Sequence, residues 1–309
     1  MKYFDLHCDT ISDCYEKQQS LYDGNLQISL KRGAAYSSWI QCFAVWIPDE
    51  VRGKAAFDYF DTIYDHMQKE IQQYSDHVML CKTAADLQTA IGQKKVGAVL
   101  TVEGGAAVAG DMGRLRYLAQ CGVKAMTLTW NSYCEIGDGA GVASPKGLTE
   151  FGRQAVREME RVNMVVDVSH ASDPLFDDVA ACTSKPFIAT HSNSRAVCNH
   201  KRNLTDDQFG VIRERGGLVG MTFAPGFLND SETPRVEDVL RHTDHFLSLG
   251  GEHCLAIGGD FDGTPLPDGM TGIESVETLA ELMLRHNYSE SLVNSILFDN
   301  AYQFFLSLL

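Results

Sequence analysis

Eight short apolar runs alternate with segments of helical periodicity along this chain, and the alternation limits the folds open to it. Each run has the length and the β-branched or apolar character of a buried strand. The runs cover residues 3–9, 39–47, 96–102, 123–129, 163–169, 186–190, 217–223 and 254–258. Between them, apolar residues recur at helical spacing, most clearly over 54–74, 148–162, 173–184 and 236–250. Strands that alternate with helices predict a parallel sheet.

The number of strand–helix units favours closure of that sheet. Eight units make a (β/α)8 barrel of the TIM type, although an open, doubly wound sheet would share the local signals. The 309 residues would fit one large barrel or two ordinary domains, but no repeat, low-complexity tract or Pro/Ser-rich linker divides them. We therefore expect an α/β fold with a single barrel domain over residues 1–309.

The charge balance excludes several classes of partner. The net charge of -15, from 41 acidic and 26 basic residues, repels phosphate backbones and anionic membrane surfaces. No run approaches the roughly 18 apolar residues of a spanning helix, and the N-terminus lacks the apolar core of a signal peptide. Nine cysteines without paired spacing indicate reduced thiols. We expect a cytoplasmic protein that binds neither nucleic acid nor membrane.

Side chains that commonly bind metals fall at the ends of the expected strands. In a closed parallel barrel the C-terminal ends of all strands share one face, where active sites of this fold lie. Residues far apart in the sequence would converge there. The residues in question are His7, Asp9, Glu103, His170, His191 and Asp260.

Each of these residues also has a structural interpretation when taken alone. The HxD pair of His7 and Asp9 puts two ligand-type side chains on the same side of a strand, but such a pair is common by chance. Glu103 follows an apolar strand, where a carboxylate needs hydrogen-bond donors or a cation. It could form a salt bridge, or it could span two metal ions and lower their repulsion.

The apolar runs before His170 and His191 share one design, in which a strand ends in a polar residue and a histidine. Either histidine alone would usually be a hydrogen-bonded core residue, but together they suit a second ion. Asp260 is a candidate acid/base or partner of a substrate amine, and Asp262 is interpreted as a loop hydrogen-bonding residue. The remaining helical or loop histidines are interpreted as structural, namely His66, His77, His242, His245, His253 and His286.

The ligand set indicates the metal and the chemistry. Histidine and carboxylate ligands without thiolates suit zinc, while manganese, cobalt or iron would also be accepted. Two such ions per chain would acidify a bridging water and polarise a carbonyl oxygen. The sequence therefore predicts metal-assisted hydrolysis of an amide.

With these residues laid out, the sequence resembles the membrane dipeptidase (renal dipeptidase) family of zinc peptidases, within the amidohydrolase-like barrels. The resemblance runs nearly end to end. It rests on DLHCDT, VEGG, MTLTWN, DVSHAS, THSNSRAVCNHKRNLTDDQ, GGDFDG and DNAYQFF, in that order. The family hydrolyses dipeptides and often tolerates a D-residue at the C-terminal position.

The resemblance implies a role for each residue of the site. It implies that His7 and Asp9 bind one zinc ion, that Glu103 bridges, and that the second ion is bound by His170 and His191. It also implies that Arg202 holds the carboxylate of the dipeptide. Asp260 would face the substrate amine or handle a proton.

The sequence departs from the renal members in two respects. Trp130 stands where they have a histidine that contacts the scissile carbonyl or its oxyanion, and the secretory signal and lipid-anchor tail of the animal forms are missing. An indole N–H is a single donor and cannot carry a positive charge. Trp130 is therefore interpreted as a wall of the substrate pocket or as an N–H donor, and Asn131 or a metal ion is expected to take over the missing contact.

A dipeptidase is the leading interpretation, with another small-amide or lactone hydrolase on the same metal site as its nearest rival. A catalytically degenerate barrel that only binds a ligand is the third, and the intact set of five ligands argues against it. The sequence does not identify the physiological dipeptide, the metal used in the cell or the oligomeric state. A homodimer is compatible with it.

Overall fold

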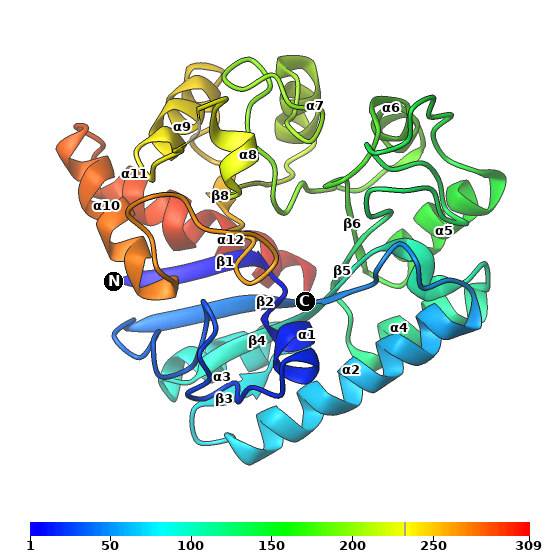
Figure 1. The fold of residues 1–309 in the computed structure, drawn as a ribbon, viewed down its shortest axis with the longest axis horizontal. Helices are drawn as coiled ribbons and strands as arrows, with labels where there is room; N and C mark the ends of the chain where they lie inside the picture. Colours follow the sequence, from blue (N-terminus) through cyan, green and yellow to red (C-terminus); the bar gives the residue numbers. More distant parts are fainter. Residues whose placement is uncertain (232) are drawn as a thin grey trace.

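The strands of this protein form a parallel sheet that curves around a common interior (Figure 1). The structure, a computed structural model, describes residues 1–231 and 233–309. Hydrogen-bonded neighbours follow the order β6-β5-β4-β2-β1-β8-β7, and β3 pairs with β4 beside this path. The strands are β1 (Lys2–Cys8), β2 (Ser38–Trp46), β3 (Val78–Leu80), β4 (Val96–Glu103), β5 (Ala125–Thr127), β6 (Val165–Asp167), β7 (Val219–Met221) and β8 (Leu255–Ile257).

Residues 186–190 close the sheet into a barrel, although they do not form the regular strand that the sequence predicts. Ile188 makes a parallel bridge to Asp167 of β6, and Ala189 makes one to Val219 of β7. The run contacts each neighbour through a single bridge, and Pro186 at its start has no N–H to donate. The expectation of a regular strand was wrong here, while the expected (β/α)8 barrel is confirmed.

The sequence patterns also missed β3. This strand has only three residues, which pair with the start of β4 at Val96 to Ala98, before β5 begins to pair at Thr101. It therefore lies beside the ring of barrel strands. A three-residue run is too short to show a period.

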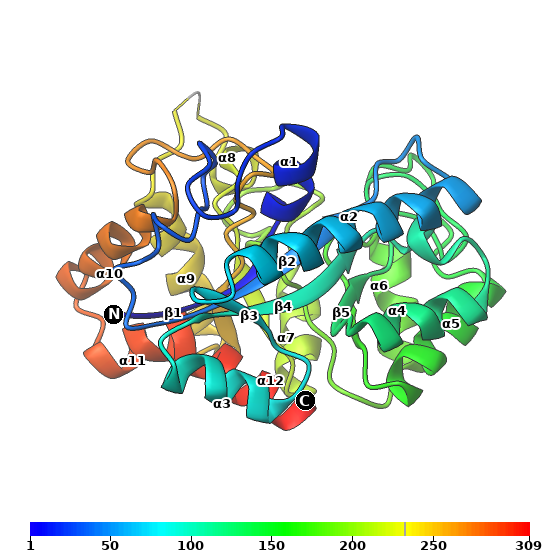
Figure 2. The same ribbon diagram turned by 90° about the horizontal axis from the view of Figure 1, so that it is seen from below.

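The helices lie around the sheet and cover it (Figures 1 and 2). Their N-termini follow local capping chemistry: Thr83 caps α3 and Thr205 caps α7 in reciprocal capping boxes, and Ser172 caps α6. All four helices expected from periodicity are present. The helices are α1 (Thr10–Glu16), α2 (Lys54–Gln73), α3 (Ala84–Gly92), α4 (Met112–Cys121), α5 (Glu150–Arg161), α6 (Asp173–Cys182), α7 (Asp206–Glu214), α8 (Pro225–Leu228), α9 (Asp238–Ser248), α10 (Val276–Arg285), α11 (Glu290–Asn294) and α12 (Asn300–Leu308).

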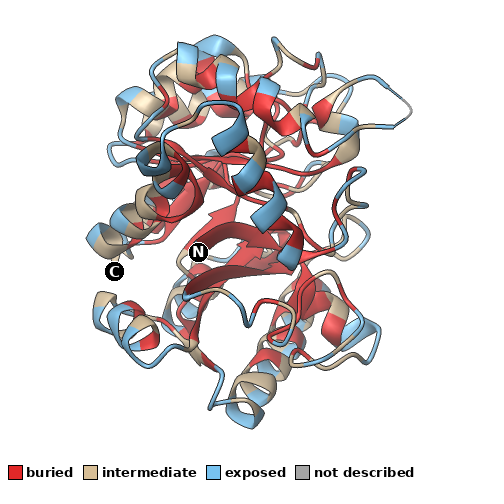
Figure 3. Ribbon diagram, turned by 90° about the vertical axis from the view of Figure 1, so that its left-hand side faces the viewer, coloured by how far each residue is buried: buried red, intermediate tan, exposed pale blue. Residues whose placement is uncertain are grey.

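The barrel interior is filled by one apolar layer, and the strands are buried almost throughout (Figure 3). Every position of the ring supplies at least one side chain to this layer. They are Phe4, Leu6, Ile40, Cys42, Val99, Ala125, Val165, Ile188, Leu218 and Ala256. Phe298 and Phe305 pack against Phe4 with tilted rings, at centroid distances of 6.4 and 5.2 Å. Figure 2 shows α12 and α3 together on one side of the strands, with α1 and α8 on the other.

A bulge in β1 turns the start of the site inward. The pairing of β1 with β2 shifts between Asp5 and Cys8, so three steps on β1 match two on β2. Leu6 belongs to the interior layer and Cys8 to the outer core with Phe43. His7, between them, can therefore join the interior, as strict alternation after Leu6 would not allow.

Within residues 1–231 and 233–309, no helix combines the length and the apolar character needed to cross a membrane.

Candidate metal centre

The side chains expected at the strand ends meet at one end of the barrel. His7 lies at the end of β1, Glu103 at the end of β4 and His170 just after β6, while His191 follows the bridged run 186–190. Their exposed fractions are 2 %, 3 %, 7 % and 0 %. Asp9, just after β1, is 6 % exposed. Such burial of polar groups is costly unless they are paired or bind an ion.

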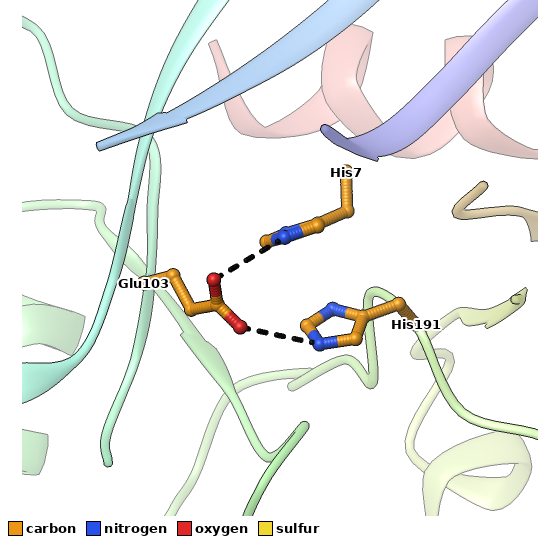
Figure 4. A group of neighbouring side chains, drawn as sticks. All are labelled: His7, Glu103 and His191. Carbon is orange, nitrogen blue, oxygen red and sulfur yellow. Dashed lines mark ion pairs between the residues drawn. The ribbon is translucent and has the colours of Figure 1, made fainter. Parts of the chain in front are cut away.

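Glu103 is the centre of the cluster (Figure 4). Its Oε2 lies 3.5 Å from His7 Nε2, while its Oε1 lies 2.8 Å from His170 Nε2 and 3.4 Å from His191 Nε2. The two carboxylate oxygens thus face different sets of histidines. His7 Nε2 also lies 3.5 Å from Asp9 Oδ2.

Asp260 completes this side of the cluster. Its Oδ1 lies 3.9 Å from His7 Nε2, and its side chain is 14 % exposed. His7, Asp9 and Asp260 form one group whose ligand atoms lie within 4.8 Å of one another, and His7, Glu103 and His191 form a second. Asp260 has a φ of 60° and His170 a φ of 65°, left-handed conformations that are uncommon outside glycine and often occur at functional sites.

Burial and the close approach of charged groups shift the pKa values of the acids and bases in this cluster. Burial raises the pKa of Asp9, and the carboxylate of Glu103 raises it further. Burial and Glu103 also raise the pKa of Asp260, to about 7, against the lowering effect of His7. Burial would lower the pKa of His7, but Glu103 and Asp9 outweigh it and raise that pKa well above its usual value. A cation among these carboxylates would relieve their mutual repulsion.

The two remaining histidines are neutral. Burial and the charge of Arg202 lower the pKa of His170 to about 4, and burial together with His7 lowers that of His191 well below its usual value. Neutral imidazole is the form that binds metals.

Several atoms of this cluster that could bind a metal have no hydrogen-bond partner among the described residues. They are His7 Nε2, His191 Nε2 and Asp9 Oδ1, all buried. Unpartnered buried polar atoms are rare in folded proteins. Nitrogen and carboxylate donors without thiolates suit zinc and related divalent ions. The residues present therefore fit a metal centre.

His170 and His191 are each oriented by a hydrogen bond at Nδ1, the ring nitrogen that faces away from Glu103. His170 Nδ1 lies 3.0 Å from Asn131 Oδ1, and His191 Nδ1 lies 2.9 Å from Thr190 Oγ1. These contacts turn each Nε2 toward Glu103. Sequence reasoning missed Thr190 and the buried Asp167 behind it. The polar residues before each histidine in DVSH and ATHS were the available signal.

Arg202 lies close to this cluster. It is 5 % exposed, its Nη2 donates to the backbone oxygen of His191 at 3.3 Å, and its guanidinium lies 5.3 Å from the ring of Phe227. Its Nε is buried with no partner in the described part of the chain. Burial lowers its pKa to about 10.

A cavity of about 410 Å³ opens over the cluster. Glu103, His170 and Asp260 line it, as do Trp130 and Trp46. The two indole rings meet edge to face at 5.1 Å. The lining comprises Asp9, Ser12, Asp13, Trp46, Glu103, Trp130, Asn131, His170, Ala224, Phe227, Asp260, Asp262, Gly263 and Thr264.

Two of the residues interpreted as structural, Asp262 and His242, make structural contacts. Asp262 accepts hydrogen bonds from the hydroxyl of Thr10 and from the backbone N–H of Gln27 and Ile28, although it also borders the cavity. Buried His242 accepts from the N–H of Ser194 and contacts the oxygen of Leu228.

A (β/α)8 barrel with a buried histidine and carboxylate cluster at the C-terminal ends of its strands defines a metal-dependent hydrolase. The model of the membrane dipeptidase family, peptidase family M19, matches residues 1–306. This chain belongs to that family, and it is a metallopeptidase.

Individual relatives agree with this assignment. An uncharacterized protein in the pqqA 5' region of Klebsiella pneumoniae is 31 % identical over 245 residues, which are 76 % of this chain and 90 % of the relative. The crystal structure of the metallopeptidase "dipeptidase AC" is 29 % identical, with a TM-score of 0.92 over 99 % of this chain and 98 % of that one. A metallopeptidase from Rhodobacter sphaeroides, bound to a phosphinate mimic of the dipeptide L-Ala-D-Ala, is 27 % identical, with the same TM-score and coverage.

Proposed function

We propose that this protein is a dipeptidase that hydrolyses the amide bond of small dipeptides and binds two zinc ions per chain. The observation that carries the proposal is the geometry of Glu103, whose two oxygens face different histidines at 3.5 Å and at 2.8 and 3.4 Å. A carboxylate so placed can bridge two ions about 3.5–4 Å apart. When bound, such ions acidify water and polarise the scissile carbonyl.

The ligands divide into two sets in this proposal. His7 and Asp9 bind one ion, His170 and His191 bind the other, and Glu103 bridges them. Support comes from the unpartnered Nε2 atoms of His7 and His191, which no other described residue satisfies. Other divalent metals would fit the same donors.

Asp260 and Arg202 bind the two charged ends of the dipeptide. Asp260 borders the cavity beside His7, where it can accept a hydrogen bond from the substrate amine or take up a proton. Gly263 makes room for it: a Cβ at that position would lie 2.6 Å from Asp260 Oδ1 and 2.1 Å from Asp9 Oδ2. The buried guanidinium of Arg202 binds the substrate carboxylate in a bidentate manner.

The cavity also sets the shape of the substrate. Trp130 and Trp46 form an aromatic part of the cavity wall, which Phe227 also lines, and Asn131, whose Oδ1 contacts His170 Nδ1, can contribute its amide N–H group. The Rhodobacter sphaeroides relative is bound to a mimic of L-Ala-D-Ala. We therefore expect this protein to tolerate a D-residue at the C-terminal position. We also propose that residues 1–309 form a single domain, because one interior layer takes side chains from the whole ring.

A screen of dipeptides tests the proposal. The zinc-loaded protein is assayed with L-Ala-L-Ala, L-Ala-D-Ala, their C-terminal amides and small lactones, with His191→Asn as the inactive control. Hydrolysis of both free dipeptides, with little of the amides, is expected. Turnover of lactones without turnover of any dipeptide would replace this proposal with another hydrolase on the same centre.

A further inference from the structure

Asp167 is a buried carboxylate at the end of β6 to which no role has so far been given. Its side chain is 1 % exposed. Oδ1 accepts hydrogen bonds from the backbone N–H of Ser169 at 2.9 Å and of Thr190 at 3.0 Å. Oδ2 accepts from the hydroxyls of Thr127 at 2.7 Å and of Thr190 at 2.5 Å. An ionised carboxylate can only accept hydrogen bonds, so each of these partners has to donate.

This arrangement determines the direction of the next hydrogen bond. The hydroxyl of Thr190 has one proton, and that proton is given to Asp167 Oδ2. Its lone pairs then face His191 Nδ1 at 2.9 Å and Ser169 Oγ at 3.3 Å. Thr190 can only accept from His191, so the proton of the neutral imidazole lies on Nδ1.

The consequence appears at the other nitrogen of the ring. With its proton on Nδ1, His191 presents a lone pair at Nε2, the atom that lies 3.4 Å from Glu103 Oε1 and has no partner among the residues described. The ring itself is held by its own backbone, since His191 N donates to Ser169 Oγ at 3.0 Å.

We propose that Asp167 and Thr190 form a positioning relay that fixes the tautomer and orientation of His191 and so prepares its Nε2 to bind a divalent cation. This inference rests on the proposed role of His191 as a metal ligand. Histidines that bind metals commonly donate their other N–H to a carboxylate, a carbonyl or water, and loss of such a partner typically weakens metal binding about 10- to 100-fold. In this protein a hydroxyl lies between the carboxylate and the histidine.

Asp167 also joins β5, β6 and the run 186–190, so a purely structural role has to be separated from the relay. The variant Asp167→Asn does this. Its amide oxygen can keep the two backbone hydrogen bonds at the position of Oδ1, while its NH₂ group takes the place of Oδ2 and donates to Thr190. The proton of the Thr190 hydroxyl is then free to point at His191 Nδ1, which lies at 2.9 Å against 3.3 Å for Ser169 Oγ, and that hydrogen bond places the imidazole proton on Nε2.

Two measurements detect this change of the His191 tautomer. In the metal-free protein, ¹⁵N NMR of the His191 ring, assigned with His191→Asn, should show the Nδ1–H tautomer in the wild type and the Nε2–H tautomer in Asp167→Asn. In competition with a chromophoric chelator, Asp167→Asn should bind one of its zinc ions about 10- to 100-fold more weakly while its circular dichroism is unchanged.

Matched variants complete the experiment. Thr190→Val removes the hydroxyl and should weaken zinc binding, whereas Thr190→Ser restores it and should bind close to the wild type. Thr127→Val removes the other hydroxyl from the same oxygen of Asp167 without touching His191, and it should leave zinc affinity close to the wild type.

The outcomes separate this proposal from the proposed function. A folded Asp167→Asn with the wild-type tautomer and zinc affinity would overturn the relay, as would equal losses in Thr127→Val and Thr190→Val. If the wild-type protein hydrolyses dipeptides but its His191 ring is in the Nε2–H tautomer, the relay alone would be overturned. The expected tautomers and affinities in a protein that hydrolyses no dipeptide would support the relay and reject the dipeptidase.

Discussion

Arg202 carries a buried positive charge that its surroundings satisfy only in part, and this makes it sensitive to substitution. A lysine cannot reproduce the planar pair of N–H groups that a carboxylate accepts from arginine. We expect Arg202→Lys to lower kcat/KM for free dipeptides by about 10- to 100-fold, the size of a lost charged hydrogen bond. Steady-state kinetics on free and C-terminally amidated dipeptides check this. Equal rates on both substrates in the wild type would show that Arg202 does not hold the carboxylate.

Trp130 gives a second prediction for a single residue. Its ring packs against Trp46 at the cavity wall and lies 6.2 Å from the ring of His170. If it acts as a wall, Trp130→Phe keeps an apolar face and should preserve kcat while it changes which side chains are accepted. Rates on a panel of dipeptides measure this. A fall in kcat of roughly a hundredfold on every substrate, with zinc content intact, would make the indole N–H a transition-state donor instead.

The sequence predicts the convergence of the ligand-type residues well, because parallel strands bring their C-terminal ends to one face whatever the details of packing. His7, Glu103 and His191 meet for this reason. It does not predict which oxygen of Glu103 faces which histidine, since that depends on side-chain rotamers. Nor does it reveal that Asp167 reaches His191 through Thr190, because such contacts need the register between β6 and the run 186–190.

At the scale of the elements, long periodic segments are predicted most reliably. The helix expected over 54–74 is found as α2, because twenty residues contain many repeats of the apolar pattern. β3, with three residues, gives no such pattern. The run 186–190 has the composition of a strand, but its pairing is decided by its neighbours and by Pro186 rather than by its own residues.

His242 on α9 links this helix to Ser194 and to the end of α8, and it makes stability depend on pH. Its Nδ1 accepts from Ser194 and its other nitrogen contacts Leu228, so only the neutral ring fits, and burial lowers its pKa from 6.5 to about 4. Between pH 6.5 and 4, His242 is protonated in the unfolded chain but stays neutral in the folded chain. The free energy of unfolding should therefore fall by up to about 1.4 kcal/mol per pH unit between pH 6.5 and 4 from this group.

Denaturant unfolding of the metal-free protein tests this dependence. His242→Gln should show a shallower decline of the free energy of unfolding over the same pH range than the wild type. His253→Gln, which changes an exposed histidine, is the matched control and should keep the wild-type slope. Identical slopes in all three proteins would mean that His242 is not the group responsible.

At the scale of the whole molecule, the buried carboxylates proposed to bind the metal lower the stability of the metal-free protein. Burial and the carboxylate of Glu103 raise the pKa of Asp9, so without a cation its ionised form destabilises the fold, and stability is lost as pH rises through that pKa. Asp9→Asn removes this charge. At pH 8 with a chelator we expect the variant to have a higher Tm than the wild type. With zinc the order should reverse, because bound ligand at a hundred times its Kd stabilises by about 2.7 kcal/mol and the variant binds it more weakly.

Scanning calorimetry measures the difference in Tm between Asp9→Asn and the wild type, once with a chelator and once with zinc. Asp58→Asn, on the exposed surface of α2, controls for the loss of a negative charge and should leave the difference between the two conditions unchanged. A lower Tm for Asp9→Asn in both conditions would mean that Asp9 stabilises the metal-free barrel. Its carboxylate would then be held by His7 alone, at 3.5 Å, and the repulsion from Glu103 would be too weak to make a cation necessary.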